Sequence, residues 1–437
     1  MRVAVVGTGH VGLVTASTLA YLGHDVVGLD NDPDKIRLLK AGTAPFFEPG
    51  LEELVNEMVA AGRLTFADTV EEAIPGREVV FLCVGTPPRA SGEANLVAVE
   101  TAGRQIAANV TGRTLLVEKS TVPAGTARRL KTTLVRERPD LQAELAVASN
   151  PEFLREGKAI EDSLEPDRIL VGADDEWAFE MLRALYEPLT SKGALLIETD
   201  IATAELSKHA SNAFLALKIS YANALARLCE KSGADVLAVA DVLGSDHRIG
   251  RAFLNAGLGY GGYCFPKDIQ AFERLAVSLG YDFPLLNEVV AINNGAVDAV
   301  VEKITDALWN LEDKRITLLG LAFKPGTDDV RLAPALVLAN RLIERGATCV
   351  GYDPQAGEAA VAEVPALALA STPYEAARGA HCVVVCTEWD EFKTLDLAKL
   401  KEVVEYPIIV DGRNIFDYDQ VREAGFSYYP TGRPPLV

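Results

Sequence analysis

The sequence predicts an α/β protein with two Rossmann-like, doubly wound parallel-sheet domains, joined by a long central helix and a helical middle domain. Three observations lead to this prediction. Short valine-rich runs alternate with helical patterns at both ends of the chain, which is typical of βαβ units. A glycine-rich turn follows the first of these runs. Between the two alternating regions lies a long helix-forming stretch without proline or internal glycine.

In the first part of the chain, apolar runs bounded by turn residues predict strands. They are expected at 2–7, 25–30, 78–85, 114–120 and 144–150, with a helix at 11–23. The stretch from Ala202 to about Gly233 predicts a single helix, which would span roughly 45 Å at 1.5 Å per residue. Because this helix is apolar on nearly all sides, we expect it to be buried against other domains or a second subunit.

Strand–helix alternation then resumes in the last third of the chain. Strands are expected at 314–323, 347–353, 381–388 and 407–412, with a helix at 335–346. We therefore expect an N-terminal α/β domain at 1–195, a helical middle at 196–310 and a C-terminal α/β domain at 311–437.

Composition excludes several classes of function. The net charge of −20 argues against nucleic acid or an anionic membrane surface as the main partner. No run approaches the roughly 18 apolar residues of a membrane span, and the chain enters a strand at once, so we expect no signal peptide. Six scattered cysteines, without CxxC or HExxH, predict neither a disulfide framework nor a metal site. Cys382 and Cys386 are interpreted as small buried hydrophobic residues rather than a metal pair. We expect a cytoplasmic location.

The first strand leads into Gly7-Thr8-Gly9-His10-Val11-Gly12, which fits the dinucleotide-binding pattern GxGxxG. The next strand ends at Asp30, about where an acidic group meets ribose hydroxyls. The glycines would let the backbone and a helix N-terminus approach a pyrophosphate, although an ordinary strand–turn–helix corner is the alternative. Because Asp30 repels a 2′-phosphate and no arginine follows it in 31–34, we expect NAD rather than NADP.

A second glycine-rich segment, 257–268, ends with Cys264, Lys267 and Asp268. Glycines allow a ligand to approach the backbone closely, a nearby ammonium favours the thiolate, and a carboxylate can take a proton or orient water. This combination predicts nucleophilic catalysis. A buried structural cysteine and a helix-capping aspartate are the alternatives.

Two further patterns involve lysines. Lys208 and Asn212 are four residues apart on the long helix and share a face. Their apolar surroundings favour burial, and a buried ammonium needs an anionic partner such as a substrate oxyanion; a solvent-exposed lysine is the alternative. Tyr263 and Lys267 match the Tyr-x-x-x-Lys pair that short-chain dehydrogenases and nucleotide-sugar epimerases carry on a helix. Pro266 and the glycines lead us to expect no helix there.

Eight segments, in order along the whole chain, resemble the motifs of the nucleotide-sugar 6-dehydrogenases, the UDP-glucose/GDP-mannose dehydrogenase family. They are GTGHVG, CVGTPP, KSTVPAGT, NPEFLREG, AELSKHASNAFLALKIS, RIGRAFLNAGLGYGGYCFPKD, GLAFKPGTDDVR and DGRNIF. The RIG segment and the cysteine loop look most like the UDP-glucose branch.

The resemblance implies a four-electron oxidation of the C6 alcohol of UDP-glucose to a carboxylate, with two NAD per sugar. Cys264 would form a thiohemiacetal with the intermediate aldehyde and then a thioester. Lys208 and Asn212 would stabilise the oxyanions. Asp268 and Thr121 would position water and move protons, and Glu152 would assist hydrolysis of the thioester.

The resemblance also implies binding residues. For NAD they are Gly7, Gly9, Val11, Gly12, Asp30, Thr86, Thr121, Lys267 and Arg331. For the nucleotide sugar they are Phe153, Leu154, Lys208, Asn212, Phe253, Gly261, Phe323, Lys324 and Arg413, with Arg248 reaching across from the neighbouring chain of a homodimer. Residues 1–195 would then bind NAD, 196–310 would form the dimer through the long helix, and 311–437 would bind the nucleotide sugar.

The sequence departs from the family pattern at two places. His10 stands where Tyr or Phe is common, at a turn where the backbone does the binding. Leu332-Ala333-Pro334 follows Arg331 where the family often has Glu-Ser-Pro, which removes polar groups near the cofactor or a domain interface.

Three alternatives remain from the sequence. The same chemistry could act on GDP-mannose or a UDP-N-acetylhexosamine. A catalytically silent nucleotide-sugar-binding protein is a second reading, which the intact Cys264, Lys208, Asn212 and Asp268 disfavour. A two-electron alcohol dehydrogenase is the third, and it would not depend on Cys264.

Overall fold

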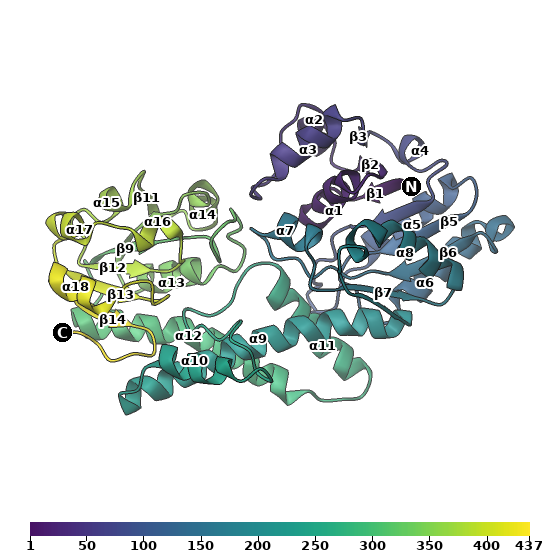
Figure 1. Ribbon diagram of the computed structural model, residues 1–437. Coiled ribbons are helices and arrows are strands. Elements are labelled where there is room, and N and C mark those ends of the chain that lie inside the picture. Colours follow the sequence, from purple (N-terminus) through teal and green to yellow (C-terminus); the bar gives the residue numbers. More distant parts are fainter. The chain divides into compact units, whose positions relative to one another are not determined.

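The computed structural model describes residues 1–437 and divides them into two compact units. The first unit comprises residues 1–211 and 270–281, and the second comprises residues 212–269 and 282–437. Figure 1 labels most of the elements of both. None of the helices has both the length and the apolar character needed to cross a membrane.

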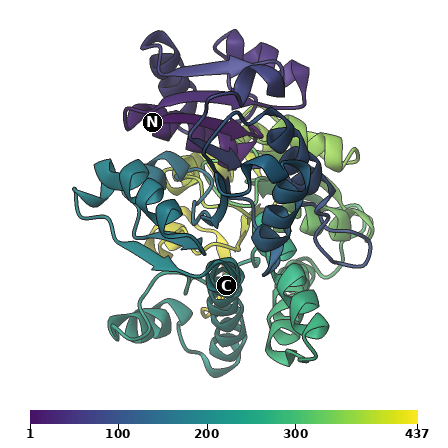
Figure 2. The ribbon, with the colours of Figure 1, turned by 90° about the vertical axis from the view of Figure 1, so that its right-hand side faces the viewer.

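The first unit is built on an eight-stranded sheet. Its strands are β1 (Arg2–Val6), β2 (Asp25–Leu29), β3 (Leu64–Ala67), β4 (Val79–Leu82), β5 (Thr114–Glu118), β6 (Leu145–Ser149), β7 (Ile169–Ala173) and β8 (Leu196–Thr199). They lie in the order β3-β2-β1-β4-β5-β6-β7-β8, and only β7 runs antiparallel to its neighbour β6. The first six strands have the strand order of a dinucleotide-binding sheet, which confirms the predicted fold class for this unit. Its purple and blue strands can be followed in Figure 2.

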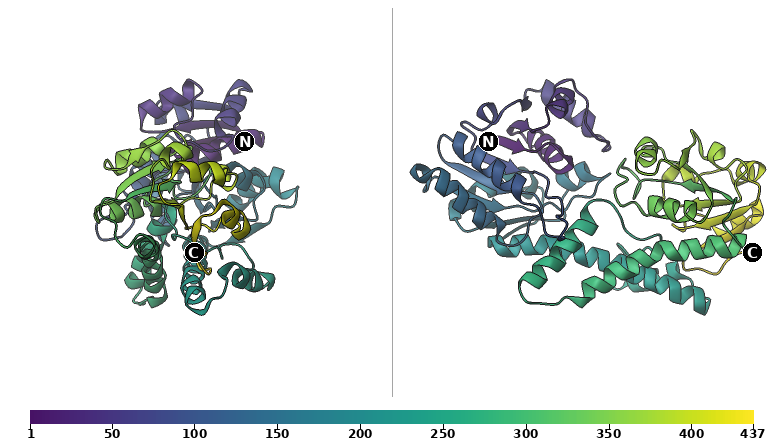
Figure 3. Two further views of the ribbon diagram at one scale, coloured as in Figure 1. Left: turned by 90° about the vertical axis from the view of Figure 1, so that its left-hand side faces the viewer. Right: turned by 180° about the vertical axis from the view of Figure 1, so that it is seen from behind.

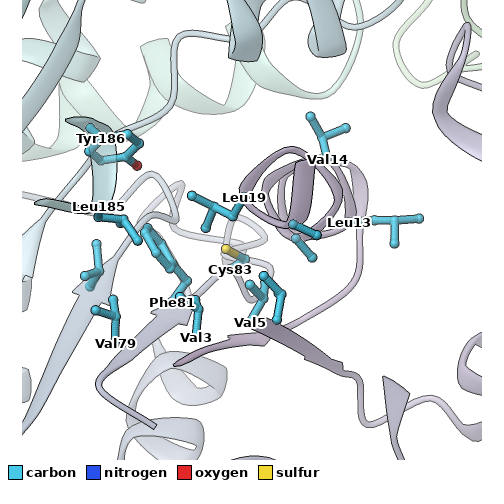
Figure 4. Close-up of a cluster of buried hydrophobic side chains, with 14 of the residues drawn as sticks. Val3, Val5, Leu13, Val14, Leu19, Val79, Phe81, Cys83, Leu185 and Tyr186 are labelled. Carbon is cyan, nitrogen blue, oxygen red and sulfur yellow. The ribbon is translucent and has the colours of Figure 1, made fainter. Parts of the chain in front are cut away.

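Both faces of this sheet are covered, as the alternation along β1 shows. Val3 and Val5 belong to one buried cluster, whereas Ala4 and Val6 belong to another on the opposite face. Figure 4 shows the first cluster, where α1 (His10–Tyr21) lies against the sheet next to Phe81. The other helices of this part are α2 (Pro33–Lys40), α3 (Leu51–Ala60), α4 (Val70–Ala73), α5 (Val97–Asn109), α6 (Thr126–Glu137), the short 3₁₀ helix η1 (Pro139–Leu141), α7 (Ala159–Leu164) and α8 (Glu176–Thr190).

The predicted long helix is confirmed as α9 (Ile201–Ser232), a helix of 32 residues. It is followed by α10 (Val236–Ser245), α11 (Cys264–Ser278) and α12 (Pro284–Leu308). The residues of α9 and α11 are divided between the two units. Three large side chains at a spacing of seven residues on α9, Phe214, Tyr221 and Leu228, are 60%, 51% and 62% exposed. Within one chain, α9 therefore keeps an exposed apolar stripe.

The expectation that no helix forms around Pro266 is wrong, since α11 already begins at Cys264. Proline is tolerated in the first turn of a helix because its missing N–H has no intrahelical partner to lose there. Tyr263 stays outside this helix. The tyrosine and Lys267 are therefore not one turn apart on a helix, as the epimerase-like pattern requires.

The second unit carries a six-stranded, fully parallel sheet. Its strands are β9 (Arg315–Leu319), β10 (Thr348–Tyr352), β11 (Ala368–Leu369), β12 (Cys382–Val385), β13 (Ile408–Asp411) and β14 (Ser427–Pro430). The order β11-β10-β9-β12-β13-β14 is again that of a Rossmann sheet. Its green to yellow strands are visible in the right panel of Figure 3. Its helices are α13 (Pro334–Ile343), α14 (Gly357–Glu363), α15 (Pro373–Ala376), α16 (Asp390–Lys393), α17 (Leu397–Val403) and α18 (Tyr418–Ala424).

This sheet also has two buried faces. Cys382 and Val384 point into one cluster, whereas Val383 and Val385 point into the other. Cys382 and Cys386 are buried, free thiols in apolar surroundings, as expected, and burial raises the pKa of Cys382 to about 12. All strands predicted from the sequence are confirmed. The strands that the sequence analysis did not predict are β3, β7, β8, β11 and β14, and all except β7 are short segments of two to four residues.

Candidate active site

The glycine turn after β1 leaves its backbone open to a ligand. Gly7 has φ +94° and donates its N–H to Leu29 O at 2.7 Å, which closes the turn against β2. A Cβ on Gly12 would overlap the carbonyl oxygen of Gly7, so only glycine lets α1 start this close to the strand. Gly9 is the N-cap of α1, and a Cβ there would meet nothing within 4 Å. The first turn of α1, which includes Val11, points backbone N–H groups that have no carbonyl partner within the helix toward the space beside Gly9. This arrangement fits a pyrophosphate.

Asp30 follows β2 and is nearly buried. Its Oδ2 accepts hydrogen bonds from the backbone N–H of Thr8 at 2.7 Å and from the Thr8 hydroxyl at 3.1 Å. Its Oδ1 accepts from Asp32 N at 3.0 Å. Lys35 Nζ lies 3.6 Å from Oδ2, a cation that the sequence analysis missed because it is one residue beyond the 31–34 stretch. The carboxylate thus ties the glycine turn to the second strand.

The loops after β4 and β5 are joined by a threonine pair. The buried Thr86 donates its hydroxyl to Thr121 O at 3.0 Å. This places both predicted cofactor residues at the carboxyl edge of the sheet, beside the glycine turn, which is where open α/β sheets bind ligands.

A buried ion pair lies at the end of the next strand, β6. Lys208 Nζ on α9 is 2.8 Å from Glu152 Oε1, and the two side chains are only 4% and 8% exposed. The other carboxylate oxygen, Oε2, accepts from Leu154 N at 2.7 Å. Burial by itself raises the pKa of Glu152, but the charge and hydrogen bond of Lys208 outweigh it and hold the pKa below its ordinary value. Glu152 is therefore an ionised base, held ready beside an ammonium.

Phe153, next to Glu152 in the same loop, has two cations near its ring. Lys208 Nζ is 5.5 Å from the ring centroid, and the Arg168 guanidinium carbon is 4.0 Å from it. Such contacts orient the ring and the ammonium together.

Two groups that the sequence analysis missed lie at the end of β5: Glu118 is its last residue, and Lys119 follows it. Lys119 Nζ donates to Asn150 Oδ1 at 3.0 Å, and burial lowers the pKa of its ammonium. Glu118 Oε1 accepts from Ser120 N at 2.9 Å, while its buried Oε2 has no hydrogen-bond partner. Burial raises the pKa of Glu118 to about 8, so this side chain is largely a neutral acid at pH 7. Only the fold, which covers both faces of β5, reveals this.

In the second unit, Cys264 is the first residue of α11 and is partly buried. The N–H groups of a helix N-terminus favour negative charge on such a sulfur. Asp268 lies one turn further along, is fully buried, and accepts a hydrogen bond from Asn212 Nδ2 at 2.6 Å through Oδ2. Lys267 Nζ lies 3.4 Å from Asp268 Oδ1. The structure thus brings Asn212, Lys267 and Asp268 together around the start of the cysteine helix.

Lys208 and Asn212 are one turn apart on α9, as the sequence predicts, and both are buried. Their side chains leave the helix on the same face. The solvent-exposed alternative for Lys208 is therefore wrong.

Two asparagines outside the cysteine loop hold its backbone, and the sequence analysis missed both. Asn223 Oδ1 on α9 accepts from Gly257 N at 2.8 Å. Asn293 on α12 pairs with both backbone groups of Tyr260: Oδ1 accepts from its N–H at 2.8 Å, and Nδ2 donates to its carbonyl at 3.1 Å. Polar residues inside helices gave no sign of this role, because their partners lie more than 30 residues away in the sequence.

Glycines in this loop allow close contact with the C-terminal sheet domain. A Cβ on Gly261 would collide with the carbonyl oxygen of Leu332, and one on Gly262, with φ +78°, would lie 2.9 Å from the Phe323 ring. Leu332 itself has φ +50° and is 63% exposed, and Pro334 starts α13 just after it. The unusual Leu332-Ala333 pair therefore lies against the cysteine loop.

Arg331 and Tyr263 form a charged cluster beside this contact. The Arg331 guanidinium is paired with Asp329 at 2.7 Å and lies 4.4 Å from the Tyr263 ring centroid. Lys267 Nζ lies 5.2 Å from the same ring, so the two predicted cofactor-binding cations flank one tyrosine.

The predicted nucleotide-sugar residues of this unit come from three loops. Lys324 Nζ lies 5.4 Å from the Phe323 ring, just after β9. Arg413, after β13, donates Nε to Cys386 O at 2.7 Å and would meet a Cβ on Gly257 at 3.1 Å. Phe253 has φ +66° and its ring lies 6.3 Å from that of Phe265.

Arg248 is placed differently from the other predicted site residues. It lies on the surface and is paired with Asp246, two residues before it. Its side chain is 78% exposed.

Comparison with known proteins decides the family. Three models of the UDP-glucose/GDP-mannose dehydrogenase family match in order: the NAD binding domain at residues 1–190, the central domain at 202–295 and the UDP binding domain at 317–418. The chain belongs to the UDP-glucose/GDP-mannose dehydrogenase family. The resemblance stated from the motifs is confirmed, and NAD is the cofactor of this family's first domain.

Three relatives show how the chain lies within the family. UDP-glucose 6-dehydrogenase of Rhizobium meliloti (strain 1021) is 45% identical over 99% of this chain and 100% of its own. The structure of a UDP-glucose dehydrogenase from Pyrobaculum islandicum is 39% identical with a TM-score of 0.90, covering 98% and 96%. That of UDP-D-ManNAc dehydrogenase from Pyrococcus horikoshii is 28% identical with a TM-score of 0.87, covering 99% of both.

We expect Lys208→Met to destabilise the protein by about 3–5 kcal/mol, because it leaves the Glu152 carboxylate buried without its cation. Removing that attraction also raises the pKa of Glu152. The double variant Lys208→Met, Glu152→Gln should recover a large part of the loss, since no buried charge remains. Urea unfolding of the wild type, the two single variants Lys208→Met and Glu152→Gln, and the double variant measures the loss and its recovery. Additive losses of the two single variants would contradict the coupling.

Glu118 predicts a pH dependence of stability. Its pKa in the folded protein, about 8, lies above its ordinary value of 4.5, so its contribution is intact below pH 4.5 and lost as the pH rises toward 8. Relative to Glu118→Gln, the wild type should lose on the order of 1.4 kcal/mol per pH unit within this window. Urea unfolding of both proteins at pH 5, 6.5 and 8 checks this. Parallel pH curves for the two proteins would show that Glu118 ionises normally.

Proposed function

We propose that this NAD-dependent dehydrogenase oxidises the C6 hydroxyl of UDP-glucose to the carboxylate of UDP-glucuronate through a thioester on Cys264. The observation that carries this proposal is the arrangement at the start of α11. Cys264 lies one turn before Asp268, and Asp268 accepts a hydrogen bond from Asn212. A thiol, a buried carboxylate and an amide in this arrangement serve acyl chemistry, which a two-electron alcohol oxidation does not need.

The residues around the glycine turn would hold NAD. Gly7, Gly9, Val11 and Gly12 offer the open backbone, Asp30 the acceptor for ribose hydroxyls, and Thr86 and Thr121 the adjoining loop edge. Lys267 and Arg331 would add cationic contacts. Bound NAD supplies hydride acceptance, which no side chain can provide.

The substrate carbon C6 is oxidised twice, and the chain's own groups handle protons and the covalent bond. In the first oxidation C6 loses a hydride and its hydroxyl loses a proton, leaving an aldehyde. Sγ of Cys264 then adds to C6, and the carbonyl oxygen takes a proton to give a thiohemiacetal. Loss of a second hydride from C6 and of the hydroxyl proton gives the thioester. Water adds to C6, the C–S bond breaks, and the carboxylate leaves. The balance is one water consumed, two NAD reduced to NADH and three protons released.

Preorganised donors support each stage that carries negative charge on oxygen. The Lys208 ammonium and the Asn212 amide, one turn apart on α9, are proposed to donate to this oxygen. Asp268, with Thr121, would position water and move protons. Glu152, ionised beside Lys208, would take a proton from the water that hydrolyses the thioester.

The nucleotide sugar would contact residues of several loops. These are Phe153, Leu154, Phe253, Gly261, Phe323, Lys324 and Arg413. The proposal of UDP-glucose is supported by relatives of that activity at 45% and 39% identity, compared with 28% for a UDP-N-acetylhexosamine enzyme. A catalytic cysteine requires a reduced thiol, so we propose a cytoplasmic location.

We also propose a homodimer formed through α9, with residues 1–195 for NAD, 196–310 for dimerisation and 311–437 for the nucleotide sugar. The stripe of Phe214, Tyr221 and Leu228 supports it, because side chains seven residues apart line one seam of a helix and these are more than half exposed in one chain. Arg248 would then serve the neighbouring chain's substrate.

Counting NADH per UDP-glucose tests the mechanism. We expect two NADH per sugar for the wild type, whereas Cys264→Ser should lose at least about a thousandfold in turnover to the acid, since its hydroxyl is a much poorer nucleophile. Absorbance at the NADH band and product analysis measure both.

The control for this experiment is Cys229→Ser, a buried cysteine of the same unit that should keep two NADH per sugar. One NADH per sugar with unaffected Cys264→Ser would overturn the thioester route. Turnover only with GDP-mannose or a UDP-N-acetylhexosamine would change the substrate and keep the chemistry.

Tyr221→Glu should split the proposed dimer, because a carboxylate in an apolar helix seam is desolvated without a partner. Sedimentation velocity should show a monomer for this variant and a dimer for the wild type. Activity should fall with it, since Arg248 could no longer reach a neighbouring substrate. Tyr281→Glu, at a similarly exposed tyrosine that is not part of α9, is the control and should remain dimeric. A Tyr221→Glu protein that sediments as the wild type does would contradict the α9 interface.

A further inference from the structure

A cavity of about 500 Å³ lies within the second unit, between α9 and α12. Its lining includes Asn223, Arg227, Gly257, Ala291, Gly295 and Ala299. The small residues of α12 stand one turn apart and leave the space open. A Cβ on Gly295 would meet nothing within 4 Å. The volume is that of a small-molecule site, and none of the proposed catalytic residues lines it.

A buried hydrogen-bond donor at the wall of this cavity lacks a partner. Asn223 is 6% exposed, and its Oδ1 is used by Gly257 N, which fixes the orientation of the amide. Its Nδ2 is buried and has no hydrogen-bond partner. An unsatisfied buried N–H group is costly, on the order of 1–3 kcal/mol, so an acceptor brought by a ligand would be favourable here.

A cation stands one turn beyond this donor on the same helix face. Arg227 is four residues after Asn223, lines the same cavity, and donates Nη2 to Gly295 O at 2.9 Å. No carboxylate forms an ion pair with it. The other charged side chains of the lining, Glu230 and Lys303, are paired with each other at 2.5 Å. The cavity therefore has one net positive charge beside walls of alanine, isoleucine and valine. At one edge lies Leu228, which also belongs to the exposed stripe of α9.

We propose that this cavity is a regulatory site for an amphipathic carboxylate. The carboxylate would accept hydrogen bonds from Asn223 Nδ2 and Arg227, and the apolar body would lie along Ala291, Gly295 and Ala299. An amide donor and an unpaired guanidinium on one face select an anion, whereas the apolar walls select against a phosphate or a nucleotide.

The regulatory part follows from the position of Asn223, and it rests on the proposed function. The same amide that faces the ligand holds Gly257 N, and Gly257 lies against Arg413, a proposed nucleotide-sugar residue. A ligand that engages Nδ2 therefore acts on the loop that would contact the substrate. By linkage, any factor by which the ligand changes the affinity for UDP is also the factor by which UDP changes the affinity for the ligand.

Calorimetric titration with octanoate tests binding, without NAD or a nucleotide sugar present. We expect saturable binding of one octanoate per chain and weaker binding of 1-octanol, which lacks the charge. Arg227→Met should weaken octanoate about tenfold, because one hydrogen bond to a charged group is lost, and leave 1-octanol unchanged. Gly295→Leu should abolish binding of both by filling the space. Asn294→Leu, at the preceding position of α12 and outside the lining, should bind as the wild type does.

Titration with UDP, with and without saturating octanoate, tests regulation. We expect its dissociation constant to change at least about threefold in the wild type and not at all in Gly295→Leu.

No saturable octanoate binding, equal binding to Gly295→Leu, or an unchanged UDP affinity would overturn the proposal. The cavity could instead be occupied by part of a second copy of the chain. In that case the wild type would not bind octanoate, and Gly295→Leu would show a smaller dimer fraction in sedimentation. This result would also overturn the proposal. Octanoate binding by a protein that binds no UDP would instead contradict the proposed function, so the two failures are distinguishable.

Discussion

Two opposite charges are buried side by side in the first unit, and much of the candidate site depends on how they are held. Lys208 lies on a helix and Glu152 in a loop, and the two residues are 56 positions apart in the sequence. Neither can be buried without the other, because an unpaired buried charge destabilises the folded protein by several kcal/mol. The pair therefore fixes α9 against the loop that follows β6. Because α9 is one continuous helix, fixing Lys208 also fixes the direction in which Asn212 leaves it. One interaction thus orients an ammonium, an amide and an ionised base.

Each sheet closes its first turn with an aspartate at the end of its second strand, but the two aspartates are used differently. Asp30 accepts from Thr8 and Asp32 and has a lysine 3.6 Å away. Asp353, at the corresponding end of β10, accepts from the N–H groups of Leu321, Ala322, Gln355 and Ala356 and from the indole of Trp389. The lone pairs of Asp353 are used within the protein, whereas Asp30 keeps capacity for a ribose. The same fold therefore binds NAD in one domain, and in the other offers different loops to a ligand.

The features that the sequence could predict are those with a local physical signature. Three such features depend only on neighbours in the chain, and all were confirmed. They are the glycine turn between a strand and a helix, the 32 residues without a helix breaker, and the four-residue spacing on one helix. The asparagines that hold the cysteine loop could not be predicted, because Asn223 and Asn293 acquire their role from partners brought together only by folding. The same holds for Glu118, whose charge state depends on burial, and for the start of α11, where tolerance of Pro266 depends on its position within the first turn.

The acidic composition and the anionic ligands expected here are compatible, because almost every cation at the candidate site has its own carboxylate. Lys208 is held by Glu152, Lys267 by Asp268, Arg331 by Asp329 and Arg413 by Glu388. Pairing keeps each cation in a fixed place before a ligand arrives, so less side-chain entropy is lost on binding. It also cancels the field at long range, so the surface does not attract polyanions without discrimination. An anion gains only where its shape brings it to several of these cations at once, which makes recognition depend on geometry rather than on charge alone. A protein with a net charge of −20 can therefore select two phosphate-bearing ligands.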